Sequence, residues 1–156
     1  PLAVFVGAIP GAIPFMLGWV AATNDFDIEP GTLFAIQFLW QFPHFWAIAW
    51  LAYDDYAKAG YFLLPTRKKD NSSAMQIIVY TLWLVFVSII PVLGFSGGLT
   101  LSWWAAILIF ALGIHLFLKA LKLRRNQDSL SARTLMFASI IYLPVVQIIY
   151  VVDRWL

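Results

Sequence analysis

Polar residues recur at helical spacing in and just before an apolar, tryptophan-rich stretch, "WQFPHFWAIAWLAYDDY" at residues 40–56. At about 100° per residue, five side chains project within an arc of about 60° on one helix: Gln37, Gln41, His44, Ile48 and Asp55. Lipid penalises polar groups, so a polar stripe on one helical face indicates a cavity rather than lipid contact. A hydrogen-bonded helix interface without any ligand explains the same stripe, and the residues alone leave both interpretations open.

Two adjacent carboxylates, Asp54 and Asp55, end this stretch, and Lys58 and the basic run 67–69 follow them. Mg²⁺ takes carboxylate oxygens together with substrate phosphates, and Lys or Arg neutralises the remaining phosphate charge. The pattern is therefore compatible with a site for Mg²⁺ and a diphosphate. Taken alone, the pair is explained more simply as two solvated charges at a helix end.

The composition indicates that these residues belong to a membrane protein. Hydrophobic residues make up 62% of the chain and charged residues only 12%, whereas about 25% of a soluble domain is normally charged. Crossing the hydrocarbon core takes about 20 apolar residues in a helix. Five segments satisfy this requirement, at residues 2–22, 31–53, 76–95, 101–121 and 135–152. The predicted fold class is an all-α integral membrane protein with five transmembrane helices.

The basic residues predict the orientation in the membrane. Nine of the ten Lys and Arg residues lie in or beside the connections 54–75 and 122–134, and only Arg154 lies elsewhere. The positive-inside rule places both connections in the cytoplasm or its equivalent. We expect the inner membrane of a bacterium, with the mitochondrial inner membrane as the open alternative. The net charge of +2 gives no indication of nucleic-acid binding, and the absence of cysteine excludes thiolate chemistry.

Three short motifs carry a resemblance to a known family: "GAIPFMLGW" at 11–19, "PHFWAIAW" at 43–50 and "DDYAKAG" at 54–60. Over essentially its whole length, the chain resembles the C-terminal half of the protoheme IX farnesyltransferases, the heme O synthases of the UbiA-type intramembrane prenyltransferase family. The resemblance implies that the five helices match the last five of a nine-helix bundle. Residues 1–156 would then be one transmembrane helical domain of a larger prenyltransferase.

The resemblance also implies an activity. Such enzymes transfer the farnesyl group of farnesyl diphosphate to a vinyl group of heme B, giving heme O and diphosphate, with Mg²⁺ as cofactor. Asp55 and Tyr56 fall on the second aspartate-rich motif of the family, and Asp54 falls where the family has Asp or Glu. Catalytic roles follow for Asp54, Asp55 and Tyr56, and metal ligation for the two aspartates. The residues expected to bind substrates are Gln37, Gln41, His44, Lys58, Arg67 and Lys68.

The chain departs from the family pattern in two ways. It lacks the first aspartate-rich motif, so we expect it to be a piece or one half of a split protein and to be inactive without the N-terminal half. Ala52-Tyr53 stands where the family commonly has a pair such as Tyr-Arg, so one diphosphate-facing cation is missing or is replaced by Lys58 or the run 67–69. Other expected partners are the lipid bilayer and heme A synthase or oxidase-assembly proteins.

Two other functions stay open at this point. One is a UbiA-type prenyltransferase with a different aromatic acceptor, although "PHFW" favours the heme enzymes. The other is a non-catalytic heme-binding or scaffold protein of terminal-oxidase assembly. His44 has three possible roles: axial ligand of the heme iron, heme contact or acid-base group, and a structural bond to the carbonyl that Pro43 frees at Leu39.

Overall fold

The computed structural model describes residues 2–155, in which the regular elements are helices joined by loops, with no strand in that range. The helices are α1 (Leu2–Thr23), α2 (Ile28–Leu51), α3 (Tyr53–Lys58), α4 (Asn71–Ile89), the 3₁₀ helix η1 (Ile90–Leu93), α5 (Trp103–Asn126) and α6 (Ser129–Asp153). Each of the five predicted spans lies mostly on one long helix, although 31–53 extends past α2 and 76–95 past α4, and this confirms the all-α fold class. Pro1 and Leu156, which the expected domain 1–156 includes, lie outside the described residues.

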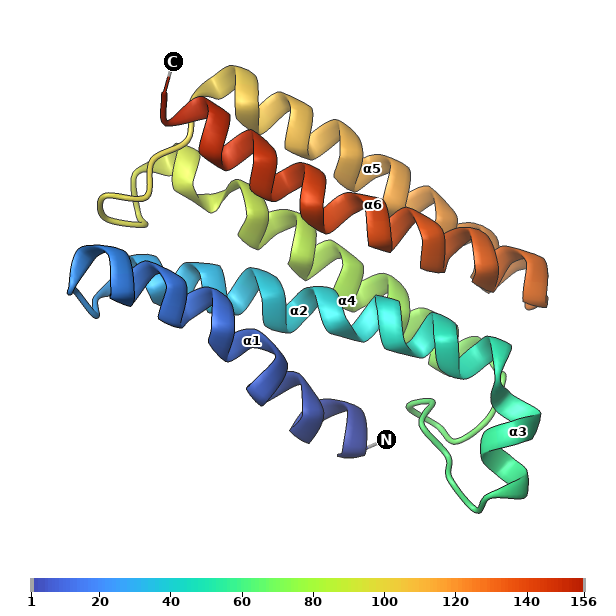
Figure 1. Cartoon of the computed structure of the whole chain (residues 1–156). Coiled ribbons are helices and arrows are strands. Elements are labelled where there is room, and N and C mark those ends of the chain that lie inside the picture. Colours follow the sequence, from blue (N-terminus) through green and yellow to red (C-terminus); the bar gives the residue numbers. More distant parts are fainter. Residues whose placement is uncertain (1, 156) are drawn as a thin grey trace.

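Four helices of this part of the chain are long and apolar enough to cross a membrane: α1, α4 with η1, α5 and α6. Helix α2 is long enough, with 24 residues, but it is not apolar enough, because it carries Gln37, Gln41 and His44. It lies in the middle of the bundle and packs against α1, α4 and α6 (Figure 1). Protein rather than lipid covers much of it, so its polar side chains are tolerated there. Its role as a fifth span stays a prediction.

Side-chain caps determine where two of the helices begin. The carboxylate of Asp70 accepts the N–H of Ser73 at 2.7 Å, and that of Asp128 accepts the N–H of Ser131 at 2.7 Å. These caps carry α4 and α6 through polar first turns, which is why both helices start earlier than the apolar runs predicted. The hydrogen bond from the N–H of Ser73 also lowers the pKa of Asp70 below its ordinary value.

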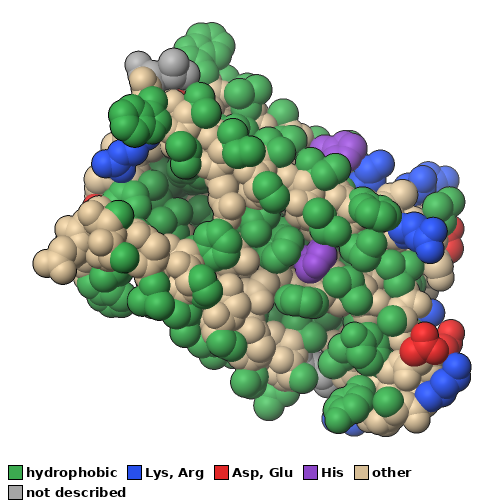
Figure 2. Space-filling view, in the orientation of Figure 1, with side chains coloured by type: hydrophobic (Ala, Val, Ile, Leu, Met, Phe, Trp, Pro, Cys, Tyr) green, Lys and Arg blue, Asp and Glu red, His purple; other side chains and the backbone are tan. Residues whose placement is uncertain are grey.

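The two ends of the bundle differ in charge. The start of α1, the segment around α3 and the connection between α5 and α6 lie at one end in Figure 1, with the other connections at the opposite end. Figure 2 shows most of the Lys and Arg side chains at the first end. At the opposite end Glu29 accepts the N–H of Gly98, and Asp153 accepts the N–H of Ser102. Successive connections therefore lie at opposite ends of the bundle, and the two basic connections share one end, as the charge pattern of the sequence predicted.

Close helix packing in the core depends on one glycine. A Cβ atom added to Gly113 of α5 would lie 2.6 Å from both γ carbons of Val85 in α4. Real side chains do not approach so closely, so these two helices meet at a distance that only glycine permits at this position.

Candidate functional site

The polar stripe of α2 lies between two neighbouring helices. On one side, Nε2 of Gln41 donates to the carbonyl oxygen of Ala8 in α1 at 2.9 Å. On the other side, Nδ1 of His44 lies 2.9 Å from the hydroxyl oxygen of Ser139 in α6. The stripe therefore occupies the sector of α2 between α1 and α6, and protein groups satisfy part of it.

A groove of about 420 Å³ separates the first half of α1 from α2. Its lining is mostly apolar and comprises Ala3, Val4, Gly7, Gly11, Gln41, Phe45, Ile48, Tyr56 and Leu63. The structure thus brings together three residues that the sequence had singled out: Gln41, Ile48 and Tyr56. A groove with these dimensions and this lining suits a long hydrocarbon group with few polar contacts.

The amide of Gln41 has a fixed orientation in this groove. Its Nε2 donates to the carbonyl oxygens of Ala8, at 2.9 Å, and of Gln37, at 3.3 Å. Both amide protons are used, so the acceptor Oε1 is the atom directed at Gly11. A Cβ at Gly11 would collide with this Oε1 and lie 3.0 Å from the Cδ of Gln41. The glycine therefore leaves the space that the amide occupies.

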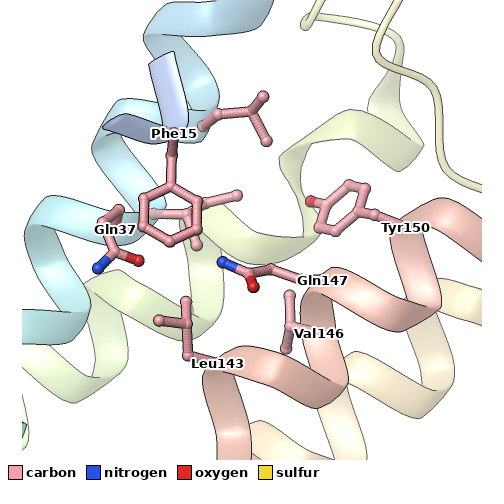
Figure 3. Close-up of a pocket in the computed structure, with 8 residues that line it drawn as sticks. Phe15, Gln37, Leu143, Val146, Gln147 and Tyr150 are labelled. Atoms are coloured by element: carbon pink, nitrogen blue, oxygen red, sulfur yellow. The ribbon is translucent and has the colours of Figure 1, made fainter. Parts of the chain in front are cut away.

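Gln37 faces a separate, smaller cavity of about 30 Å³. Figure 3 shows its amide and that of Gln147 beside Phe15 of α1 and Leu143 of α6. Within the described part of the chain, the buried Oε1 of Gln37 has no hydrogen-bond partner. The cavity is large enough to hold one water molecule, which would satisfy this oxygen. The stripe thus divides between two spaces rather than lining one.

His44 forms its hydrogen bond with α6 and not with a carbonyl of its own helix. Its ring stacks on that of Trp40, with centroids 4.6 Å apart and an interplanar angle of 14°. The indole N–H of Trp40 donates to the carbonyl oxygen of Ser139 at 2.6 Å. Of the three roles open for His44, the structural one required a bond to the carbonyl near Leu39; among the described residues the hydrogen bond of His44 is instead the one from Nδ1 to Ser139. Helix α2 runs through Pro43 without a break.

The two carboxylates lie on α3 and are exposed to solvent. Asp55 forms an ion pair with Lys58 at 3.3 Å, and both side chains are largely exposed, at 82% and 78%. Such a pair contributes little to stability and leaves the carboxylate oxygens open to a cation. Residues 2–155 contain no group of three or more His, Asp or Glu side chains that could hold a metal ion. Two carboxylates still fit Mg²⁺, which keeps several waters and shares phosphate oxygens.

The placement of Asp55 on the same helix as His44 is wrong. Helix α2 ends at Leu51, and Asp55 belongs to the separate helix α3, so the helical phase does not continue to it. The segment that follows α3 holds this helix in place, since the hydroxyl of Tyr53 donates to the carbonyl oxygen of Arg67 at 3.0 Å. The ammonium of Lys69 lies 5.2 Å from the centre of the same ring. The carboxylates are consequently displaced from the stripe.

The predicted cations share one end of the molecule with the carboxylates, where blue and red side chains lie side by side in Figure 2. Arg67 and Lys68 are exposed on the segment that follows α3. Among the described residues, Lys58 with Asp55 is the one ion pair, so Arg67 and Lys68 do not contact the carboxylates. Ser139 was not among the residues that the sequence singled out, because no local signal connects it to His44, 95 positions away.

Known proteins resemble this chain over nearly its full length. The sequence matches the UbiA prenyltransferase family over residues 1–141. The chain belongs to the UbiA prenyltransferase family. Among curated relatives of this UbiA chain is a protein named protoheme IX farnesyltransferase from Flavobacterium johnsoniae, 57% identical over 155 residues. That match covers 99% of the chain and 52% of the relative.

Two further relatives carry the same name. The protein from Christiangramia forsetii is 56% identical over 156 residues, covering 100% of this UbiA chain and 52% of the relative. The protein from Cytophaga hutchinsonii is 47% identical over 155 residues, covering 99% of this chain and 53% of the relative. The chain thus spans about half the length of the curated relatives it matches. No solved structure matches it significantly.

Proposed function

We propose that the protein containing this chain transfers a farnesyl group from farnesyl diphosphate to a vinyl group of heme B. The products would be heme O and diphosphate. The observation that carries the proposal is the 57% identity, over 99% of the chain, to a protein named protoheme IX farnesyltransferase. The apolar groove supports it, because its lining includes Tyr56, the residue after two exposed carboxylates, and the substrate is itself an apolar chain with an anionic headgroup.

The diphosphate headgroup would bind at the end of the groove. Asp54 and Asp55 would hold Mg²⁺, which would neutralise the negative charge that develops on the departing diphosphate. Lys58 already lies 3.3 Å from Asp55, so its ammonium can reach phosphate oxygens bound beside that carboxylate. Arg67 and Lys68 would supply further positive charge from the neighbouring segment. Their bonds to phosphate would form when the headgroup is bound.

The farnesyl chain would lie in the groove between α1 and α2. Tyr56 lines this groove although the preceding residue, Asp55, faces solvent. Helix α3 therefore directs a carboxylate to water and an aromatic ring to the apolar space at adjacent positions. The boundary between headgroup and hydrocarbon would then lie at Tyr56. Gln41 would contact the chain or the acceptor deeper in the groove.

The orientation in the membrane is also a proposal. The basic end of the bundle would face the cytoplasm of a bacterial cell, and the protein would lie in the inner membrane. Cysteines introduced at the exposed positions Ser72 and Ser129 should then react with an impermeant reagent from the cytoplasmic side only. A cysteine at Thr23 should react from the opposite side only. Labelling of Ser72 from outside would overturn this orientation.

The activity is tested with membranes that contain the complete protein. Heme B, farnesyl diphosphate and Mg²⁺ are supplied, and heme O is measured by mass spectrometry, with the Asp55→Asn variant as the control. We expect heme O from the wild type and none from the variant. Heme binding without product would favour the non-catalytic heme-binding or scaffold protein. Farnesylation of another aromatic acceptor would favour a different UbiA-type enzyme.

A further inference from the structure

The bond between His44 and Ser139 determines which nitrogen of the histidine carries the proton. The hydroxyl of Ser139 donates to the carbonyl oxygen of Met136 at 2.6 Å, and a carbonyl can only accept. A serine hydroxyl has a single proton, so it cannot also donate to Nδ1 of His44 at 2.9 Å. Nδ1 must therefore be the donor. The neutral ring then has a bare lone pair on Nε2.

Neighbouring groups also fix the plane of this ring. Trp40 stacks on one face, and its own indole is anchored to the backbone of Ser139. Phe45 meets the ring edge to face, with centroids 5.3 Å apart. The histidine is half-buried, and among the described residues its Nε2 accepts no hydrogen bond. A fixed lone pair without a protein partner thus lies in the sector of α2 between α1 and α6.

We propose that Nε2 of His44 is an axial ligand of the heme iron, and that Ser139 and Trp40 are positioning residues for it. The inference rests on the proposed function, since it assigns the heme as the ligand. Neutral imidazole is a common ligand of heme iron. Ligating histidines donate their other N–H to a fixed acceptor, which sets the tautomer and the ring orientation. Ser139 supplies that acceptor here.

The first experiment compares two porphyrins and two serine variants of the complete protein. Ser139→Ala removes the acceptor of His44. Ser88→Ala is the matched control, because Ser88 is also fully buried and donates to a carbonyl of its own helix, that of Leu84 at 2.8 Å. Hemin and metal-free protoporphyrin IX are titrated into each protein, and the Soret band is recorded. The metal-free ring keeps the stacking surface but has no iron to ligate.

We expect Ser139→Ala to weaken hemin binding by about tenfold or more and to shift the Soret band, as is usual for partners of a metal-ligating histidine. Binding of metal-free protoporphyrin IX should stay unchanged, and Ser88→Ala should resemble the wild type with both ligands. Equal hemin affinity and spectrum in the two serine variants would overturn the inference. Equal losses for both porphyrins in Ser139→Ala would do so too, because they would show packing rather than ligation.

The second experiment observes the tautomer directly. Nitrogen NMR of protein with ¹⁵N-labelled histidine distinguishes protonated from bare ring nitrogens, and the signals lost in His44→Gln identify this residue. Without heme, we expect a protonated Nδ1 and a bare Nε2. A protonated Nε2 in the wild type would overturn this inference and leave the proposed function standing. The expected tautomer in a protein that binds no hemin would instead overturn the proposed function, and the ligation with it.

Discussion

Replacing Gly11 with alanine tests how the groove between α1 and α2 is built. The new Cβ would collide with Oε1 of Gln41 and lie 3.0 Å from Cδ and Nε2 of the same side chain. The backbone of α1 cannot retreat without losing its packing on α2, so the flexible amide must move. Gln41 then loses its 2.9 Å hydrogen bond to the carbonyl oxygen of Ala8.

The free energy of unfolding should barely change, because two effects oppose each other. Alanine favours a helix over glycine by about 1 kcal/mol. Losing one hydrogen bond costs about 0.5–1.5 kcal/mol. With Gln41→Ala already present there is no amide to displace, so Gly11→Ala should stabilise the protein by the full ~1 kcal/mol. The double-mutant cycle should therefore give a coupling energy of about 1 kcal/mol between Gly11 and Gln41.

The assay is denaturant unfolding of the complete protein in lipid–detergent micelles, for the wild type, both single variants and the double variant. Gly18→Ala is the control, because it lies in the same helix and its Cβ would meet no atom of the described chain within 4 Å. It should stabilise the protein equally in both backgrounds. If Gly11→Ala does the same, so that the coupling is below about 0.3 kcal/mol, Gly11 does not restrain Gln41.

Three further outcomes are expected in the complete protein. Asp55→Asn should abolish farnesyl transfer at saturating Mg²⁺ while leaving heme binding intact, and Asp54→Asn should be milder; equal rates in the two variants would contradict these roles. Because the pKa of Asp70 is lowered in the folded protein, its cap stabilises the fold at pH values above the ordinary carboxyl pKa. This stabilisation is lost as the pH falls through the folded-state pKa. Asp70→Ala should therefore cost about 1 kcal/mol at pH 7, and a difference from wild type that persists unchanged in acid would refute this. Gly113→Ala should destabilise the protein by up to about 2 kcal/mol. Overpacking costs about 1–3 kcal/mol, and the higher helix propensity of alanine offsets about 1 kcal/mol of this cost. In the Val85→Ala background the same change should be stabilising, and unfolding curves that show no such reversal would argue against the contact.

The long helices could be predicted from the sequence because each contains an apolar run of sufficient length. Their starts could not be predicted equally well, since Asp70 and Asp128 extend α4 and α6 into polar turns through single hydrogen bonds. Helix α3 was missed for a different reason. Its separation from α2 goes with a hydrogen bond from the hydroxyl of Tyr53 to the carbonyl oxygen of Arg67. Arg67 lies in the connection after α3, where no regular spacing of residues would predict this bond.

The candidate site was predicted in part. Helical phase correctly placed Gln37, Gln41 and His44 on one face of α2, because their backbone is a continuous helix. Their partners could not be predicted, since Ala8 and Ser139 lie 33 and 95 positions away in the sequence. The phase also failed beyond Leu51, where α2 ends. The distribution of polar groups between two spaces follows from helix packing, which one sequence does not reveal.

The polarity of α2 has a consequence for how the chain enters the bilayer. Taken alone, a helix that carries Gln37, Gln41 and His44 inserts poorly, because each polar side chain raises the cost of transfer from the translocon. Helix α1 is synthesised just before it, is long and apolar enough to cross a membrane, and offers the carbonyl of Ala8 to Gln41. We expect the two helices to insert together as a hairpin. Weakening their contact would then first reduce the amount of correctly inserted protein, and only afterwards the turnover of the molecules that remain.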